Sequence, residues 1–155
     1  MAVEDKSKSI GRLISILHRH TQIYFRRELG PYGIGKGQFI FLAALFERDG
    51  VSQEYLSNRL LIDKGVTARA IQKLEEAGYV IREVDPDDKR VNVICLTKKA
   101  LELRTIFKEV AERWTNMLTS DFSEEEKELA LMLLRRMAEN VAYLRTDMRT
   151  RPKID

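Results

Sequence analysis

The chain has 155 residues, of which 44% are hydrophobic and 33% are charged, a size that suits one compact unit with helical extensions. Its formal net charge of +3 and pI of about 9.0 permit nucleic-acid binding without requiring it. The single cysteine excludes an internal disulfide and fits a reducing cytoplasm. The first ten residues lack the apolar core of a signal peptide, and no window approaches the roughly 20 apolar residues of a membrane span. We therefore expect a cytoplasmic protein outside the membrane.

Two helices are predicted in the N-terminal third. Apolar residues at spacings of three and four predict a helix from Ser7 to about Leu29, and the Gly30-Pro31-Tyr32-Gly33 turn ends it. A second helix is predicted from Lys36 to Arg48. Its expected buried stripe consists of Phe39, Leu42, Ala43 and Phe46.

The next stretch has the pattern of a helix-turn-helix. Ser52 can cap a short helix whose apolar residues are Tyr55, Leu56 and Leu60. Asp63 offers a second N-cap, so we place a recognition helix at residues 63–77, with Gly78 closing it in the left-handed conformation. The residues expected to face inward from this helix are Val66, Ile71 and Leu74.

A predicted β-hairpin follows directly. Residues 79–84 and 91–96 are rich in β-branched and aromatic side chains, and the turn-forming residues 85–90 separate them. A hairpin after a helix-turn-helix is a winged helix.

This order of elements resembles the MarR family of transcription regulators. The residues that carry the resemblance are Leu74-Glu75, Gly78, Arg82, Asp85, Asp88, Arg90 and Leu96-Thr97. One departure is Ala100, where the family usually has glycine. The resemblance implies a mainly α (α+β) fold, a winged helix-turn-helix with long N- and C-terminal dimerisation helices. It also implies a dimeric DNA-binding regulator, more often a repressor.

Two long helices are predicted at the C-terminal end. Thr97 can cap one that runs to about Thr119, and a capping box from Ser123 to Glu126 begins another that runs to about Asp147. We expect one MarR-type domain over residues 7–147, divided into a winged helix (34–96), dimerisation helices (7–30 and 97–147) and a tail (148–155).

The apolar stripes of the terminal helices predict a homodimer. They are too long for a domain of roughly 65 residues to cover, and exposed apolar surface costs about 25 cal/mol per Å². The alternative is a monomer whose terminal helices fold back on its core.

The recognition helix and the wing supply the candidate contacts to double-stranded DNA. Arg69 suits a guanine and Gln72 an adenine in the major groove. Other side chains suit thymine methyl groups or phosphates, and by resemblance Arg90 enters the minor groove while Asp88 pairs with it. The full set is Ser52, Gln53, Lys64, Thr67, Ala68, Arg69, Gln72, Lys73, Asp88, Lys89 and Arg90. A dimer would read a near-palindromic operator. The alternatives are a solvated polar face on the helix and a simple ion pair at the hairpin tip. The alternative function is a winged helix that contacts proteins.

Other kinds of site have weaker support in the sequence. By resemblance, a small aromatic or phenolic anion binds where the dimerisation helices meet the winged helix, and relieves repression. The candidate residues are His18, Arg19, Tyr24, Phe39 and Phe46, with an ordinary core as the alternative. We expect no cofactor and no metal, since the two histidines lie two residues apart, and no enzyme activity. Cys95 is interpreted as a buried strand residue.

Overall fold

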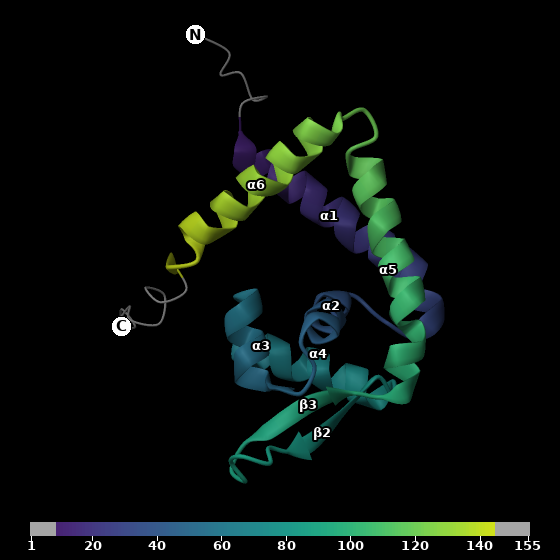
Figure 1. Ribbon diagram of the computed structural model, residues 1–155, viewed down its shortest axis with the longest axis vertical. Helices are drawn as coiled ribbons and strands as arrows, with labels where there is room; N and C mark the ends of the chain where they lie inside the picture. The colour runs from purple at the N-terminus through teal and green to yellow at the C-terminus, as the bar shows by residue number, and fades with distance from the viewer. Residues whose placement is uncertain (1–8, 145–155) are drawn as a thin grey trace, which may run out of the picture.

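The computed structural model describes residues 9–144, which form six α-helices, a 3-10 turn and a three-stranded sheet (Figure 1). The elements are α1 (Ile10–Leu29), η2 (Gly30–Tyr32), α2 (Phe39–Glu47), β1 (Val51–Ser52), α3 (Gln53–Leu60), α4 (Lys64–Glu76), β2 (Val80–Val84), β3 (Asn92–Leu96), α5 (Lys98–Leu118) and α6 (Glu124–Val141). The mainly α winged helix-turn-helix with long terminal helices is confirmed. The expected start at Ser7, the end at Asp147 and the tail lie outside the described residues.

Local capping chemistry explains why these helices begin where they do. The hydroxyl of Ser52 accepts from the backbone N–H of Tyr55, and the hydroxyl of Thr97 accepts from that of Ala100. The Ser123–Glu126 capping box is complete in both directions. Each cap satisfies backbone donors that have no partner inside the helix, so these predicted starts are confirmed.

The second helix differs from the prediction. It begins at Phe39 rather than Lys36 because Gly37 adopts a left-handed conformation, with φ 78°, that a helix cannot contain. Leu42 of the predicted stripe is fully buried, but Phe39, Ala43 and Phe46 are only half-buried, and the other buried residues of the helix are Phe41, Ala44 and Leu45. α2 is covered on most sides because it lies at the centre of the winged-helix unit (Figure 1).

The sheet ties the wing to this core. Its order is β1-β3-β2, with Val51 opposite Ile94 and Ile94 opposite Arg82. Ile94 is fully buried, as are Leu45 and Ile71 on the helices beneath it. The centre of the sheet is therefore fixed to the core, while the hairpin projects away from it (Figure 1).

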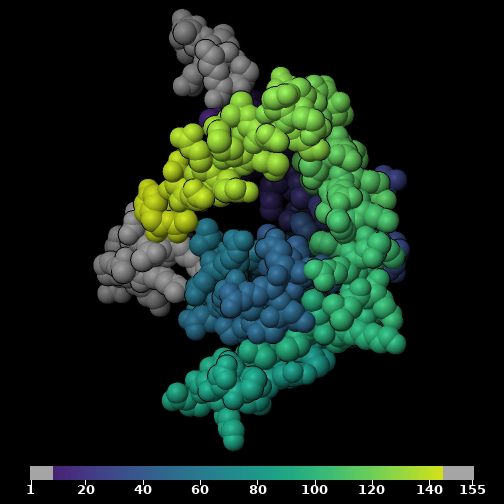
Figure 2. All heavy atoms as spheres, in the orientation of Figure 1, coloured from purple at the N-terminus to yellow at the C-terminus, as the bar shows by residue number. Residues whose placement is uncertain are grey.

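The terminal helices are joined to the winged-helix core at one end and extend away from it at the other (Figure 1). α1 packs on α5 through its C-terminal half, where the Tyr24 hydroxyl donates to the Val110 carbonyl, the Tyr24 ring stacks on Trp114, and Phe25 and Leu29 are buried. No residue of α6 between Glu124 and Val141 is buried. Figure 2 shows α6 and the end of α5 as an arm, with a hollow between it and the winged helix. The apolar stripes of α6 and of the N-terminal half of α1 are therefore largely uncovered within one chain, whereas α5 buries Leu103, Phe107 and Val110 in the core.

Candidate nucleic-acid interface

The recognition helix α4 is fixed at both ends by its own sequence. At the N-terminus, the Asp63 carboxylate accepts from the backbone N–H groups of Gly65 and Val66, at 2.7 and 3.3 Å. At the C-terminus, Gly78 has φ 80°, and its N–H and that of Tyr79 donate to the carbonyls of Glu75 and Leu74. These bonds form a Schellman motif. The helix therefore has a defined length and a defined direction.

The outward face of α4 carries most of the predicted DNA contacts. Lys64, Arg69, Gln72 and Lys73 are exposed. A Cβ added at Gly65 would lie 3.7 Å from Arg69 Nη1, so the Arg69 guanidinium lies over the first turn. The first turn of a recognition helix is the part that reaches base edges in the major groove. The Arg69 guanidinium is therefore exposed beside the N-terminal turn of α4.

Two of these side chains have acidic neighbours that the sequence interpretation did not include. Gln72 Nε2 donates to Glu76 Oε1 at 3.1 Å, and Lys64 Nζ lies 3.5 Å from Glu54 Oε1. Both contacts are exposed and therefore contribute little to stability. They hold the amide and the ammonium near the surface that the helix presents.

Thr67 was predicted to face outward and Val66 inward, and both predictions were wrong. Val66 lies on the outer face of α4 instead of Thr67. Thr67 is 0% exposed and its hydroxyl donates to the Asp63 carbonyl at 2.9 Å, whereas Val66 is 45% exposed. The buried face runs through Thr67, Ile71 and Leu74 at helical spacing, which an inward Val66 would break. Ala68, also predicted to face outward, is half-buried.

Replacing Thr67 by valine is expected to lower stability and leave DNA recognition unchanged. Valine fills the same space, but the bond to the Asp63 carbonyl is lost, at a cost of about 1 kcal/mol. Urea unfolding measures the first effect and gel-shift titration the second. A shift in base preference with Thr67→Val would place this side chain at the DNA after all.

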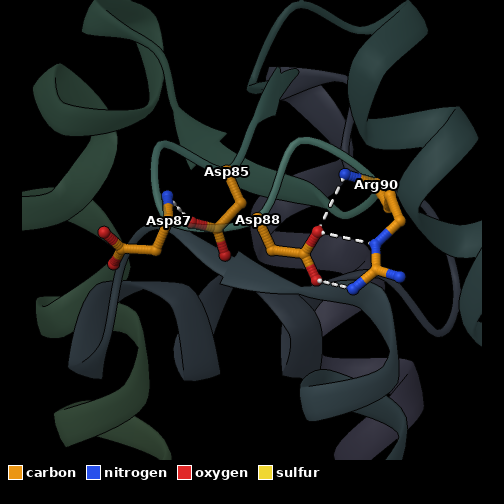
Figure 3. A network of polar contacts seen from close by, with 4 residues as sticks. All are labelled: Asp85, Asp87, Asp88 and Arg90. Carbon is orange, nitrogen blue, oxygen red and sulfur yellow. Dashed lines mark hydrogen bonds and ion pairs between the residues drawn. The ribbon is translucent and has the colours of Figure 1, made fainter.

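The wing tip is organised by its own carboxylates. The Asp88 carboxylate accepts three hydrogen bonds from Arg90 (Figure 3). The donors are the side-chain Nε at 3.1 Å, the side-chain Nη2 at 3.4 Å and the backbone N–H at 3.1 Å. These hydrogen bonds lower the pKa of the Asp88 carboxyl below its usual value. The bond from the Arg90 side chain has the larger effect and the bond from its backbone N–H the smaller. Asp85 accepts from the Asp87 N–H. The predicted Asp88–Arg90 pair is therefore present, and the Arg90 side chain, 90% exposed, remains open to a ligand.

Near the start of α3, Ser52 and Gln53 are half-buried. The Ser52 hydroxyl is used as the cap, and Gln53 Oε1 accepts from Arg82 Nη1 at 3.0 Å. This contact was not foreseen, because it joins residues 29 positions apart in the chain.

The predicted ligand residues do not come together. His18 and Arg19 line a hollow of about 300 Å³ with Gln22, Ile23, Arg26 and Lys36. The three aromatic residues pack elsewhere: Tyr24 stacks on Trp114, Phe39 stacks on Phe25, and Phe46 meets Phe107 edge-on. Tyr24, Phe39 and Phe46 thus belong to the core between α1, α2 and α5.

The thiol of Cys95 lies on the wing and is half-buried. Burial raises its pKa, and so do the nearby carboxylates of Glu83 and Asp49. A raised pKa disfavours the reactive thiolate. Within residues 9–144, no cluster of three or more His, Cys, Asp or Glu side chains could hold a metal ion. No helix in that range is long and apolar enough to cross a bilayer.

The sequence and structure of the chain resemble those of known proteins. The MarR family model matches residues 32–91. A MarR transcriptional regulator from Methanosarcina mazei is 44% identical, with a TM-score of 0.82 over 87% of this chain and 97% of its own. A putative MarR family regulator from Listeria monocytogenes, solved with 26mer DNA, is 27% identical, with a TM-score of 0.88 over 96% and 99% of the two chains. The uncharacterized HTH-type regulator YybA of Bacillus subtilis is 28% identical over 90% of each chain. The chain belongs to the MarR family of transcription regulators, as its recognition helix and wing had indicated.

Proposed function

We propose that the protein is a homodimeric repressor that binds a near-palindromic DNA operator and releases it when a small aromatic anion binds. The observation that carries the proposal is the shared exposure of Arg69 on α4 and Arg90 on the wing, in one winged helix. The regulator from Listeria monocytogenes, solved with DNA, supports it. Selection from random duplexes tests it: an enriched sequence supports the proposal, and no enrichment at low salt contradicts it.

The exposed apolar surface of the terminal helices supports the dimer. On α1, α5 and α6 it includes Ile10, Leu13, Ile14, Leu17, Met117, Leu118, Leu129, Leu131, Met132, Leu133, Leu134 and Val141. Burying one such side chain gains about 1.5–3 kcal/mol. A second copy offers the same face, and a twofold interface is self-complementary. We therefore assign residues 7–30 and 97–147 to dimerisation and residues 34–96 to DNA binding.

The two recognition helices of a dimer set the operator geometry. Half-sites lie one helical turn apart, about 34–36 Å, or a multiple of it. We assign base reading to Arg69 and Gln72, and phosphate contacts to Lys64, Lys73 and the start of α3. Because phosphate contacts release counterions, affinity is expected to fall steeply with salt.

Arg90→Ala is expected to lower operator affinity about tenfold without changing the thermal midpoint. The side chain is exposed, so its loss removes no packing, while a narrow minor groove attracts its charge. Lys98→Ala, which removes an exposed cation outside the wing, is the control. Equal affinities for Arg90→Ala and the parent protein in a gel-shift titration would exclude the wing from DNA binding.

The hollow on α1 supports the effector. Its lining residues include Arg19, Arg26 and Lys36 and no carboxylate, so it suits an anion. The apolar side chain of Ile23 also lines the hollow, so an aromatic carboxylate would meet both cations and apolar surface there.

Hydroxybenzoate at 100 times its Kd is expected to raise the thermal midpoint by about 5 °C or more. Arg19→Ala should abolish the shift in thermal midpoint. Arg12→Ala, which removes a cation two turns away on the same helix, should keep the shift. Neutral hydroxybenzamide is the ligand control, because it lacks the charge. Equal shifts with acid and amide, or none with either, would remove the anion site from the proposal.

A further inference from the structure

Arg82 reaches from the wing to both helices of the helix-turn-helix. Its Nε lies 3.3 Å from Oε2 of Glu75, in the last turns of α4. Its Nη1 donates to Oε1 of Gln53, the first residue of α3. One guanidinium therefore joins β2, the recognition helix and the start of α3.

The two ends of this side chain are both held firmly. On the backbone side, Arg82 pairs with Ile94, which is fully buried and pairs in turn with Val51. On the guanidinium side, two different donors of a planar group are directed to two different helices. Arginine fixes the angle between its donors, and lysine does not. The link therefore constrains the orientation of the wing as well as its distance.

Stability does not explain this arrangement. The side chains of Arg82 and Glu75 are 35% and 40% exposed, and surface pairs of this kind contribute little to folding. The contacts matter more for the orientation of the wing. The hairpin tip lies about five residues beyond Arg82, or roughly 17 Å at strand rise. A rotation of about 15° at the root would move the tip by roughly 4 Å, more than a hydrogen bond tolerates.

We propose that Arg82 is a positioning residue for DNA binding. By holding Glu75 and Gln53, it sets the angle between the wing and α4, so that Arg90 and Arg69 engage neighbouring grooves of the same duplex. This inference rests on the proposed DNA-binding function. It assigns Arg82 no contact with DNA.

The direction in which one substitution changes DNA affinity distinguishes a positioning role from a simple effect of charge. Glu75 is an anion on the DNA-binding unit, so removing its charge should strengthen binding to phosphates if charge alone matters. If Glu75 acts by holding Arg82, Glu75→Met should instead weaken binding about tenfold. Glu83→Met is the matched control, because it removes one negative charge from the neighbouring wing residue and leaves both Arg82 contacts in place.

The experiment measures the affinity of the full-length protein for its selected duplex, for Glu75→Met, Glu83→Met, Arg90→Ala and the Glu75→Met/Arg90→Ala pair. We expect the double variant to bind about as weakly as either single variant, roughly tenfold below the parent. Arg82→Lys, which keeps the charge and loses the fork, should behave like Glu75→Met. Thermal midpoints should stay within a few degrees of the parent.

Two results would overturn the inference. In one, Glu75→Met binds as well as Glu83→Met; in the other, the two losses multiply to about a hundredfold, so that Glu75 acts independently of the wing. If Glu75→Met fails to fold, Arg82→Lys, which keeps the charge and loses the fork, carries the same expectation. A parent protein that binds no duplex contradicts the proposed function, whereas normal parent binding with an unaffected Glu75→Met contradicts this inference alone.

Discussion

Leu17→Glu and Leu133→Glu are each expected to produce a monomer that no longer retains operator DNA. Leu17 on α1 and Leu133 on α6 are 43% and 38% exposed in the single chain, so a carboxylate there stays in water and the subunit tolerates it. In a dimer the same carboxylate would be buried against apolar side chains. With about 3 kcal/mol lost per copy and two copies per twofold interface, the dimer should weaken roughly 10⁴-fold.

Sedimentation equilibrium measures the association, and gel-shift titration measures the DNA affinity. Asn140→Glu is the matched control, because it adds the same charge to an exposed polar position of α6. That variant should remain dimeric and bind as the parent does. Circular dichroism establishes that each variant is folded. If Leu17→Glu and Leu133→Glu both sediment as dimers, these helices do not form the interface.

Arg69→Ala is expected to cause the largest loss of operator affinity among single substitutions on α4, together with a loss of base preference. A forked arginine contact with guanine contributes about 1–3 kcal/mol. Two recognition helices double the effect, so we expect a loss of roughly 10³-fold for the dimer. Competition titration against duplexes with one substituted base pair per half-site identifies the position that Arg69 reads.

Lys73→Ala provides the comparison for Arg69→Ala, because it removes one exposed cation from the same helix. As a phosphate contact, Lys73 should weaken all duplexes alike and lower the salt dependence by about one charge per subunit. Arg69→Ala should flatten the preference at one base pair, which Lys73→Ala leaves unchanged. If both variants keep the parent's full base preference, α4 does not read the sequence through Arg69.

Local chemistry explains which parts of the fold could be predicted from the sequence. Ser52, Asp63, Thr97 and Ser123 each cap a helix through contacts within three residues, and such contacts depend on little else. Gly78 ends α4 for the same reason, since its left-handed conformation is a property of the residue and its nearest neighbours.

The errors and omissions depend on packing between distant residues. Val66 is more apolar than Thr67, so the sequence favoured the wrong one for the core, whereas the helix phase set by Ile71 and Leu74 buries the threonine. β1 has two residues and is a strand only because β3 lies beside it. The contacts of Arg82 likewise depend on the way the wing folds back on α3 and α4.

The predicted DNA-binding residues follow the same division. Spacing identified Lys64, Arg69, Gln72 and Lys73 because the exposed face of a helix repeats every 3.6 residues. The predicted ligand set combined residues that the fold separates. Its three aromatic members pack in the core, away from His18 and Arg19. His18 and Arg19 do share a hollow, but its remaining cations are Arg26, two turns further along α1, and Lys36.

The mass of the complex with a selected duplex tests most directly whether two subunits jointly read DNA. The measurement is sedimentation equilibrium of the protein with the enriched duplex, at protein concentrations near the Kd. We predict a near-palindromic sequence carrying two chains, twice 18.0 kDa, with half-sites about 10–10.5 base pairs apart or a multiple of that spacing. One chain per duplex, or an enriched sequence without twofold symmetry, would contradict it.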